Sequence, residues 1–262
     1  MTESLQTRDG RSVLRMERSL KHPPEKVWRA MIEPDRLADW FPGKVTLDLR
    51  AGGSLEFEDE DGNAEGTGTI TDLDPPRLIA YTWGTDHLRW ELHPDGDGTR
   101  LVLLHTFDDR AAAASYGAGW HTCVVALDLA LDGRAGTDPG VDDIALHERL
   151  VTQLGLDAGT VETGADGWKV RYERQLTRPA DGVWGALTEL APPGSSAHEH
   201  VLEHEVDEGG RVRWELVAGT GHGARLLLTH TGTSGDPAAA RAADRSRIAR
   251  LLERLEAVPT GR

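Results

Sequence analysis

The sequence has few of the features that mark secreted, membrane-bound or disulfide-rich proteins. Its 262 residues include one cysteine, Cys123, so no disulfide can form within the chain, as expected in a reducing compartment. No apolar run approaches the roughly 20 residues of a membrane-spanning helix, and the first residues contain no apolar segment of the signal-peptide type. We therefore expect a cytoplasmic protein without a membrane partner.

Basic residues and cofactor motifs are scarce as well. The chain has 29 lysines and arginines against 44 aspartates and glutamates, which gives a formal net charge of −15. Because this charge repels phosphate backbones, we expect no nucleic-acid partner. The glycine-rich patterns GxGxxG and GxxxxGK[ST] and the nucleophile pattern GxSxG are absent from the sequence, and we expect no cofactor.

Phenylalanine and tyrosine are rare, with three of each, whereas tryptophan occurs eight times. Large indole side chains either fill a core or line a cavity. Whether these tryptophans pack together or surround a ligand is therefore the main functional question that the sequence raises.

The chain contains an internal repeat, which has to be recognised before its fold can be assigned. The segment ERSLKHPPEKVWRAMIE at 17–33 matches ERQLTRPADGVWGALTE at 173–189. The segment LRWELHPDGDGTRLVLLHT at 88–106 matches VRWELVAGTGHGARLLLTHT at 212–231, which aligns His105 with His230. The offset between the copies falls from 156 to about 125 residues between these two blocks, so the second copy lacks the middle of the first.

Periodicity and turn residues predict the same order of elements in both copies, with fewer strands in the second. In the first copy we expect a strand at 12–20, a helix after Pro23-Pro24, a short helix between Pro34 and Pro42, strands near 44–49, 53–58, 64–73, 77–83, 87–93 and 99–107, and a long helix at 111–132. In the second we expect a strand at 168–176, a helix at 180–190, about three strands within 199–231 and a helix at 237–257.

The predicted organisation is a complete domain at 1–134, a linker with a short helix at 135–166 and a truncated domain at 167–262. A long amphipathic helix that follows an antiparallel meander buries its apolar stripe by lying across the concave face of the sheet, and such a sheet can enclose a pocket. Because the second copy lacks the short helix and about two strands, we expect it to have lost the pocket. It would then serve as a packing partner that either docks on the first copy or mediates a homodimer.

Several blocks in the first copy resemble the START/Bet v 1-like (SRPBCC) superfamily, namely PPEKVWRAMIEPDRLADWF, AGGSLEFED, DPPRLIAYTW, GTRLVLLHTF and GWHTCVVALDLAL. Within it, the first copy more closely resembles the subgroup named after the C-terminal domain of the activator of Hsp90 ATPase. The resemblance covers about residues 11–133, and the second copy only in part. It implies an α+β helix-grip fold, a curved antiparallel sheet wrapped around a long C-terminal helix. The cavity of such folds often accepts lipids, polyketides or other apolar molecules, but the fold does not transfer an activity.

The candidate ligand-binding residues are aromatic side chains that the predicted strands and helices of the first copy bring to one face. They are Trp40, Tyr81, Trp83, Trp90, Tyr116 and Trp120. As a set they could line an apolar pocket in which a phenol and indole N–H groups are the few polar groups. The alternative is that they pack against one another as core. The expected ligand is an apolar small molecule or lipid.

A catalytic role is the second hypothesis, in which Tyr81, Tyr116 or a histidine acts as acid or base in an aromatase/cyclase or hydrolase type of enzyme. His105 recurs as His230 in the copy that we expect to lack a pocket, which favours a structural role, and His121 lies beside the aromatic stripe. No carboxylate that would orient either histidine is evident from the spacing, so we assign no catalytic residue.

Two further patterns have simpler interpretations. The segment HEHVLEH places His198, His200 and His204 on one face of a predicted strand, but a solvated histidine-rich edge is favoured over a metal site. Cys123 lies in an apolar helix stripe and is expected to be a buried thiol. The third hypothesis for the whole protein is a protein-interaction module such as a chaperone cofactor.

Overall fold

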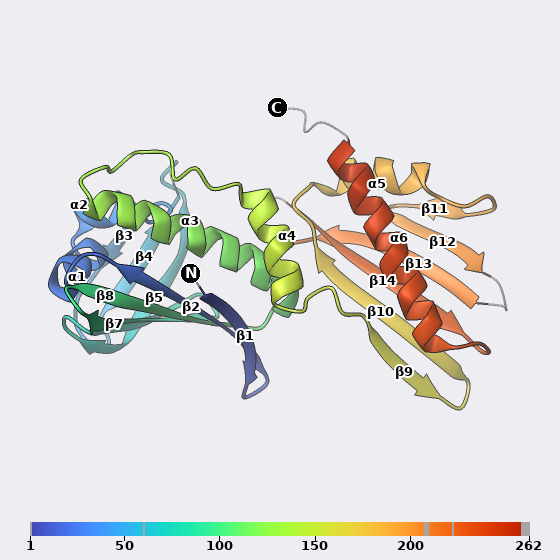
Figure 1. Ribbon diagram of the computed structural model, residues 1–262, viewed down its shortest axis with the longest axis horizontal. Coiled ribbons are helices and arrows are strands. Elements are labelled where there is room, and N and C mark those ends of the chain that lie inside the picture. Colours follow the sequence, from blue (N-terminus) through green and yellow to red (C-terminus); the bar gives the residue numbers. More distant parts are fainter. Residues whose placement is uncertain (1, 60, 207–209, 222, 258–262) are drawn as a thin grey trace. The chain divides into compact units, whose positions relative to one another are not determined.

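The computed structural model describes residues 2–257 except 60, 207–209 and 222. The chain divides into two compact units, residues 1–150 and 151–262, each with its own antiparallel sheet and a long helix that crosses one face of that sheet (Figure 1). This confirms the α+β helix-grip architecture. None of the helices in the described ranges combines the length and apolar character that a bilayer-spanning segment requires.

The first unit contains an eight-stranded sheet with the order β1-β2-β8-β7-β6-β5-β4-β3. Its strands are β1 (Thr2–Arg8), β2 (Arg11–Leu20), β3 (Lys44–Leu47), β4 (Ser54–Glu58), β5 (Ala64–Asp74), β6 (Leu78–Trp83), β7 (Asp86–Asp95) and β8 (Gly98–Phe107). Its helices are α1 (Pro24–Ile32), α2 (Pro34–Leu37), the 3-10 turn η1 (Arg110–Ala112) and α3 (Ala113–Leu131), and α4 (Asp143–Gln153) begins within it. The strands and helices predicted for 12–132 are confirmed, apart from small shifts of their ends.

Helix α3 is the long helix that crosses the sheet, and its sequence suits that position. Small residues such as Ala113, Ala114 and Gly117 are fully or largely buried and let the helix backbone approach its neighbours. A Cβ atom at Gly117 would lie 2.9 Å from Leu150 Cδ1, so glycine is needed for this close approach. The indole of Trp120 projects from the same helix into the core.

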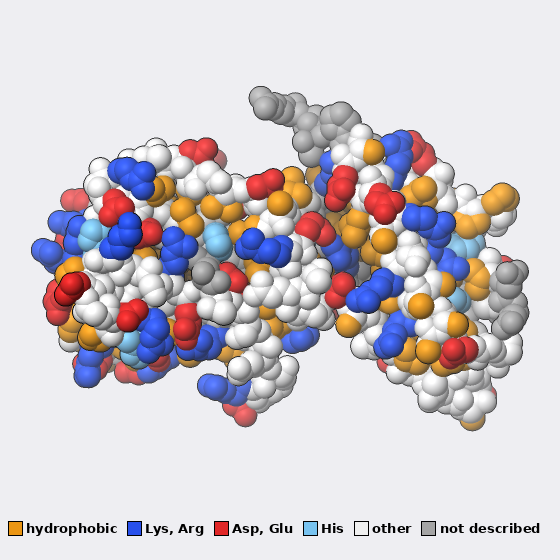
Figure 2. Space-filling view, viewed as in Figure 1, with side chains coloured by type: hydrophobic (Ala, Val, Ile, Leu, Met, Phe, Trp, Pro, Cys, Tyr) orange, Lys and Arg blue, Asp and Glu red, His pale blue; other side chains and the backbone are white. Residues whose placement is uncertain are grey.

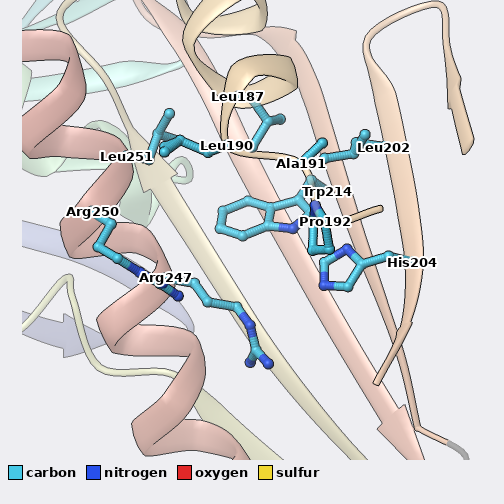
Figure 3. Close-up of a pocket in the computed structure, with 10 residues that line it drawn as sticks. All are labelled: Leu187, Leu190, Ala191, Pro192, Leu202, His204, Trp214, Arg247, Arg250 and Leu251. Carbon is cyan, nitrogen blue, oxygen red and sulfur yellow. The ribbon is translucent and has the colours of Figure 1, made fainter. Parts of the chain in front are cut away.

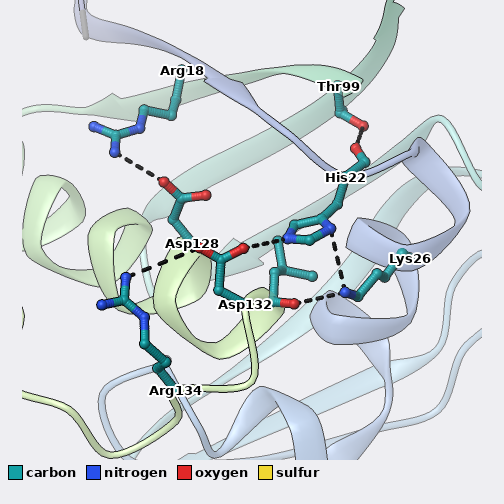
Figure 4. Close-up of polar contacts among 8 residues, drawn as sticks. Arg18, His22, Lys26, Thr99, Asp128, Asp132 and Arg134 are labelled. Carbon is teal, nitrogen blue, oxygen red and sulfur yellow. Dashed lines mark hydrogen bonds and ion pairs between the residues drawn. The ribbon is translucent and has the colours of Figure 1, made fainter. Parts of the chain in front are cut away.

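Polar contacts fix the C-terminal end of α3 to the junction of β2 and α1 (Figure 4). Lys26 Nζ donates a 2.6 Å hydrogen bond to the backbone oxygen of Leu131, which satisfies a carbonyl of the last helical turn. His22 Nε2 lies 2.9 Å from Asp132 Oδ1, and this contact lowers the pKa of the Asp132 carboxyl group. This end of the helix is therefore held by directed bonds as well as by packing.

The second unit contains a six-stranded sheet with the order β11-β12-β13-β14-β10-β9. Its strands are β9 (Thr160–Gly164), β10 (Gly167–Gln175), β11 (Ser196–His198), β12 (Val201–Val206), β13 (Gly210–Ala218) and β14 (Ala224–Gly232), and its helices are α5 (Ala180–Glu189) and α6 (Pro237–Ala257). The two sheets have the same strand order, because β9, β10, β14, β13, β12 and β11 of the second correspond in turn to β1, β2, β8, β7, β6 and β5 of the first. Among the described residues, the second unit has no counterpart of α2, β3 and β4.

The register of the strands supports the same correspondence. Leu88 of β7 pairs with His105 of β8 in the first unit, and Val212 of β13 pairs with His230 of β14 in the second. The two histidines that the sequence repeat aligns therefore occupy equivalent positions in the two sheets.

Three edge strands were not expected from the sequence, namely β1, β9 and the three-residue strand β11. Strands β1 and β9 expose most of their side chains, so they show no alternation of apolar and polar residues, and residues 160–164 were expected to be linker. Each is the first strand of a hairpin, and the β1–β2 turn is made by Asp9 and Gly10, both with positive φ. An Asp-Gly pair favours this turn, and it was the available signal for β1.

Candidate functional site

Most aromatic side chains of the first unit form one continuous cluster between the sheet, α3 and the segment after α1. The ring centroids of Trp90 lie 5.9 Å from those of Trp40 and 5.4 Å from those of Trp120, with both pairs edge to face. Phe57 and Trp83 stack at 4.3 Å. Edge-to-face and offset-stacked pairs each add about 0.5–1.5 kcal/mol beyond the burial of their area, so the cluster stabilises the unit as it stands.

The space inside this cluster is small. A void of about 20 Å³ lies between α1, the residues that follow it and strands β3, β4, β6 and β7. It is lined by Met31, Leu37, Trp40, Phe41, Val45, Leu47, Leu55, Phe57, Ile79, Tyr81 and Trp90. Such a volume holds about one water molecule, whereas pockets for drug-sized ligands measure about 300–1,000 Å³.

The six aromatic residues singled out from the sequence occupy four different places. Trp40, Tyr81 and Trp90 line the void, and Trp120 packs behind it against Trp90. Trp83 is partly exposed and stacks on Phe57 at the edge of the cluster. Tyr116, the sixth residue, packs against His105.

His105 connects the cluster to a carboxylate. Its Nε2 lies 2.9 Å from Asp86 Oδ2, and its Nδ1 accepts a 3.2 Å hydrogen bond from the indole N–H of Trp120. The indole donor fixes the tautomer, because an acceptor Nδ1 leaves the proton on Nε2, where it is donated to Asp86. Tyr116 packs against the His105 ring at 4.7 Å and is partly exposed, so the structure separates it from the void.

Asp86 is the orienting carboxylate that spacing alone did not reveal. It lies two residues before Leu88, the cross-strand partner of His105, so it is a diagonal neighbour on the same face of the hairpin. The pairing register of β7 and β8, had it been predicted, would have indicated Asp86 as a neighbour of His105. His121 lies elsewhere, with its Nδ1 3.6 Å from Glu3 Oε1, and burial lowers the pKa of its ring.

Residues 34–43, which we call the cover segment, close the void. Trp40 and Phe41 from this segment point into the cluster and are each 6% exposed. The backbone N–H groups of residues 36–41 donate to oxygens of residues 33–37, so these bonds stay within the segment and its immediate start. Gly43, with φ +84, then carries the chain into β3.

Two residues of this site were missed in the sequence. Phe41 contacts four rings of the cluster, and Phe57 contacts three. Phe57 alternates with Leu55 along β4, and both side chains are buried. Period-two spacing was therefore the signal for Phe57, whereas Phe41 lies in a turn where no periodicity applies.

Tyr81 is the main polar group in the void, and it is buried. Its hydroxyl accepts a 3.2 Å hydrogen bond from Trp90 Nε1, and burial raises the pKa of the phenol well above its usual value. The phenol therefore stays neutral, and the void carries no charge.

The second unit contains a larger pocket, contrary to the expectation that it had lost one. We call it the α5–α6 pocket; it measures about 120 Å³ and lies between α5, α6, β12 and β13 (Figure 3). Its lining residues are Leu187, Leu190, Ala191, Pro192, Leu202, His204, Trp214, Arg247, Arg250 and Leu251. The expectation was wrong because α5, α6 and the six strands leave space beside the small side chains of Ala191 and Pro192, even without a counterpart of α2.

The histidines of the HEHVLEH segment do not come together. His198 ends β11, and Glu199 and His200 form a turn with positive φ, so the three histidines do not lie on one strand as expected. His200 lies near Asp181, whereas His204 is buried and lines the α5–α6 pocket. Within the described ranges, no group of three or more His, Cys, Asp or Glu side chains could hold a metal ion.

A further hollow of about 310 Å³ lies between residues 158–159, Tyr172 and α6. Two of its three polar side chains are already engaged, because the Tyr172 hydroxyl donates to the backbone oxygen of Arg241 at 2.7 Å and Arg245 pairs with Asp157 at 3.0 Å. We therefore regard the α5–α6 pocket as the better candidate in this unit.

Comparisons with known proteins place the first unit. A model of the family described as activator of Hsp90 ATPase homolog 1-like protein matches residues 21–132. A conserved protein of unknown function from Enterococcus faecalis is similar in structure, with 20% identity, a TM-score of 0.52 and coverage of 58% of this chain and 90% of that one. At this identity the likeness shows a shared fold.

Other solved structures match with lower scores. CalU16 from Micromonospora echinospora is 21% identical, with a TM-score of 0.44 and coverage of 59% of this chain and 94% of that one. An AHSA1-like protein from Aeromonas hydrophila is 20% identical, with a TM-score of 0.42 and coverage of 48% and 96%. No curated protein matches the chain. Over residues 21–132, the first unit is therefore similar to the activator of Hsp90 ATPase homolog 1-like family.

Proposed function

We propose that the first unit binds a small apolar molecule or lipid between the cover segment and the sheet. The observation that carries the proposal is the void beneath Trp40 and Phe41, whose lining is apolar except for the Tyr81 hydroxyl and two indole N–H groups. Those polar groups are bonded to one another or to the backbone, since Trp40 Nε1 donates to the oxygen of Ala30 and Trp90 Nε1 donates to Tyr81. The site therefore suits a ligand that needs few hydrogen bonds.

Binding requires the cover segment to move, because the void holds about one water molecule in its closed form. The hydrogen bonds at the C-terminal end of α3 hold that helix in place, so the site would not open at this end (Figure 4). The backbone hydrogen bonds of the cover segment lie within the segment, so they can stay intact when it moves. Exposing a side chain of the size of Phe41 costs about 1.5–3 kcal/mol. An aromatic ring that takes its place restores the burial of the surrounding rings and offsets this cost.

A titration of the full chain with the neutral fluorescent probe N-phenyl-1-naphthylamine tests the proposal. We expect one probe to bind per chain, and Phe41→Ala to bind it more tightly because the site is then already emptied. Leu49→Ala is the matched control, since Leu49 is 38% exposed and lies outside the void. If wild-type protein binds no apolar probe, and Trp83→Ala and Trp120→Ala change only the stability, the proposal fails.

The geometry gives less support to the other two hypotheses. Both ring nitrogens of His105 are hydrogen bonded, to Asp86 and Trp120, so neither is free to exchange a proton with a substrate in this arrangement. The chaperone-cofactor hypothesis stays a prediction, which a pull-down with Hsp90 followed by measurement of its ATPase activity would decide.

A further inference from the structure

We propose that the α5–α6 pocket of the second unit binds a small monocarboxylate whose apolar part has about four to six carbon atoms. This goes beyond the function proposed for the first unit, because it concerns a different pocket and a charged ligand. Four features carry it, which are the pocket's size, its apolar floor, an arginine without a carboxylate partner and a buried histidine nitrogen without a hydrogen bond.

The size and floor of the pocket fit a short apolar group. An apolar cavity of about 150 Å³ accepts benzene, and this pocket measures about 120 Å³. Its floor is formed by Leu187, Leu202, Trp214 and Leu251, all of which are at most 4% exposed and belong to the core of the unit. A ligand there would bury its carbon atoms against side chains that are already fixed by packing.

The charged groups of the pocket favour a single negative charge. Arg247 Nη1 lies 2.5 Å from Asp244 Oδ1, and the fully buried Asp244 carboxylate also lies 2.9 Å from His230 Nδ1. The charge of Arg247 is therefore largely offset. Arg250 is exposed and forms no ion pair within the part of the chain that the structure describes, so it supplies one positive charge that a monocarboxylate would balance.

Other basic side chains lie nearby on the surface. Figure 2 shows Lys and Arg side chains along the face that α6 presents, with hydrophobic and some Asp and Glu side chains between them. Arg245, Arg247 and Arg254 of this helix are paired with carboxylates. The charge that remains to attract an anion at the pocket is therefore that of Arg250. The surroundings of the pocket are thus compatible with an acidic ligand.

His204 offers a hydrogen bond that no described group uses. The residue is 7% exposed, and its Nδ1 is buried without a partner. A buried polar atom left unpaired costs about 1–3 kcal/mol, so a ligand that satisfies it binds more tightly. Burial lowers the pKa of the ring, with the charge of Arg247 as a second cause, and the neutral tautomer with its proton on Nδ1 can donate to a carboxylate oxygen.

The pocket also separates its apolar and polar groups. In Figure 3 the leucines lie in the upper part of the pocket, while His204 from β12 and Arg247 and Arg250 from α6 lie below them. The ring of Trp214 lies between these two groups. This order matches a molecule with a hydrocarbon part and a terminal carboxylate.

Isothermal titration calorimetry of the full chain with hexanoate, hexanamide and acetate tests the proposal. Hexanamide keeps the shape of hexanoate without its charge, and acetate keeps the charge without most of the hydrocarbon. We expect hexanoate to bind with a Kd below about 1 mM and both analogues to bind at least about 10-fold more weakly. Equal binding of hexanoate and hexanamide would overturn the proposal, as would the absence of binding at about 10 mM hexanoate.

Matched variants locate the site. Arg250→Gln removes the unpaired charge at an exposed position, so the protein should fold normally, and we expect hexanoate to bind about 10- to 100-fold more weakly. Arg241→Gln is the control, because it removes the same charge from the same helix outside the pocket. Unchanged affinity in Arg250→Gln would refute the proposal. Tighter binding of hexanoate by Phe41→Ala, in which the site of the first unit is already emptied, would instead place the carboxylate in the first unit and refute the proposed second site.

Discussion

Replacing Phe41 by alanine removes the residue that closes the aromatic cluster. Phe41 is 6% exposed, and its ring contacts Trp40, Phe57, Trp83 and Trp120 at centroid distances of 5.6–6.2 Å. Phenylalanine-to-alanine changes in cores cost about 3–5 kcal/mol. We expect a value near the upper end, because four rings lose an edge or face partner together.

Hydrogen exchange measured by mass spectrometry can report this loss in each unit separately. Peptides from β6, β7 and β8 should lose protection in Phe41→Ala, whereas peptides from β12, β13 and β14 serve as an internal control and should not change. Benzene should then restore protection, because an apolar ligand at about 100 times its Kd adds about 2.7 kcal/mol of stability.

Two results would refute this reasoning. One is a loss of less than about 1 kcal/mol, which would mean that the cluster does not depend on the cover segment. The other is a cavity in Phe41→Ala that benzene does not enter, which would mean that the surrounding rings collapse into the space.

Other predictions concern ionisable groups that are buried or half-buried. Burial raises the pKa of the Cys123 thiol to about 12, so about one thiol in ten thousand is ionised at about pH 8. A thiol reagent should therefore label Cys123 slowly until urea unfolds the protein. Rapid labelling of the folded protein would contradict this. Asp244→Ala leaves Arg247 without its carboxylate partner and should destabilise the second unit by about 3–5 kcal/mol in denaturant unfolding, whereas a cost below about 1 kcal/mol would show that the network is dispensable. Burial lowers the pKa of His121 and His204 from 6.5 in the folded protein, so the unfolded chain binds protons more readily. The free energy of unfolding should therefore be constant above about pH 6.5 and fall below it. A free energy of unfolding that rises on acidification through this range would contradict the lowered pKa of these histidines.

Much of the fold was predictable because its elements follow simple periodicities. Strands β7 and β8 alternate buried and half-buried residues along most of their length, and α1 begins at a proline with its apolar side chains on one face. Strands β1 and β9 were missed because edge strands with mostly exposed side chains carry no such alternation.

The sites were harder to predict because they depend on register and on volume. The Asp86–His105–Trp120 contacts combine two strands and a helix, and their geometry follows from the hairpin register rather than from spacing along the chain. The size of each pocket depends on which side chains fill the space between helix and sheet. In the first unit Trp40 and Phe41 fill it, while in the second the short side chains after α5 leave it open.

The indole N–H spectrum of uniformly ¹⁵N-labelled protein, assigned with tryptophan-to-phenylalanine variants, tests the central claim most directly. If the first unit binds apolar molecules under the cover segment, N-phenyl-1-naphthylamine shifts the signals of Trp40 and Trp90 and leaves that of Trp214 unchanged, because Trp214 lies in the other pocket. If the probe leaves Trp40 and Trp90 unchanged at saturation, the aromatic cluster is core alone and the account of its function is wrong.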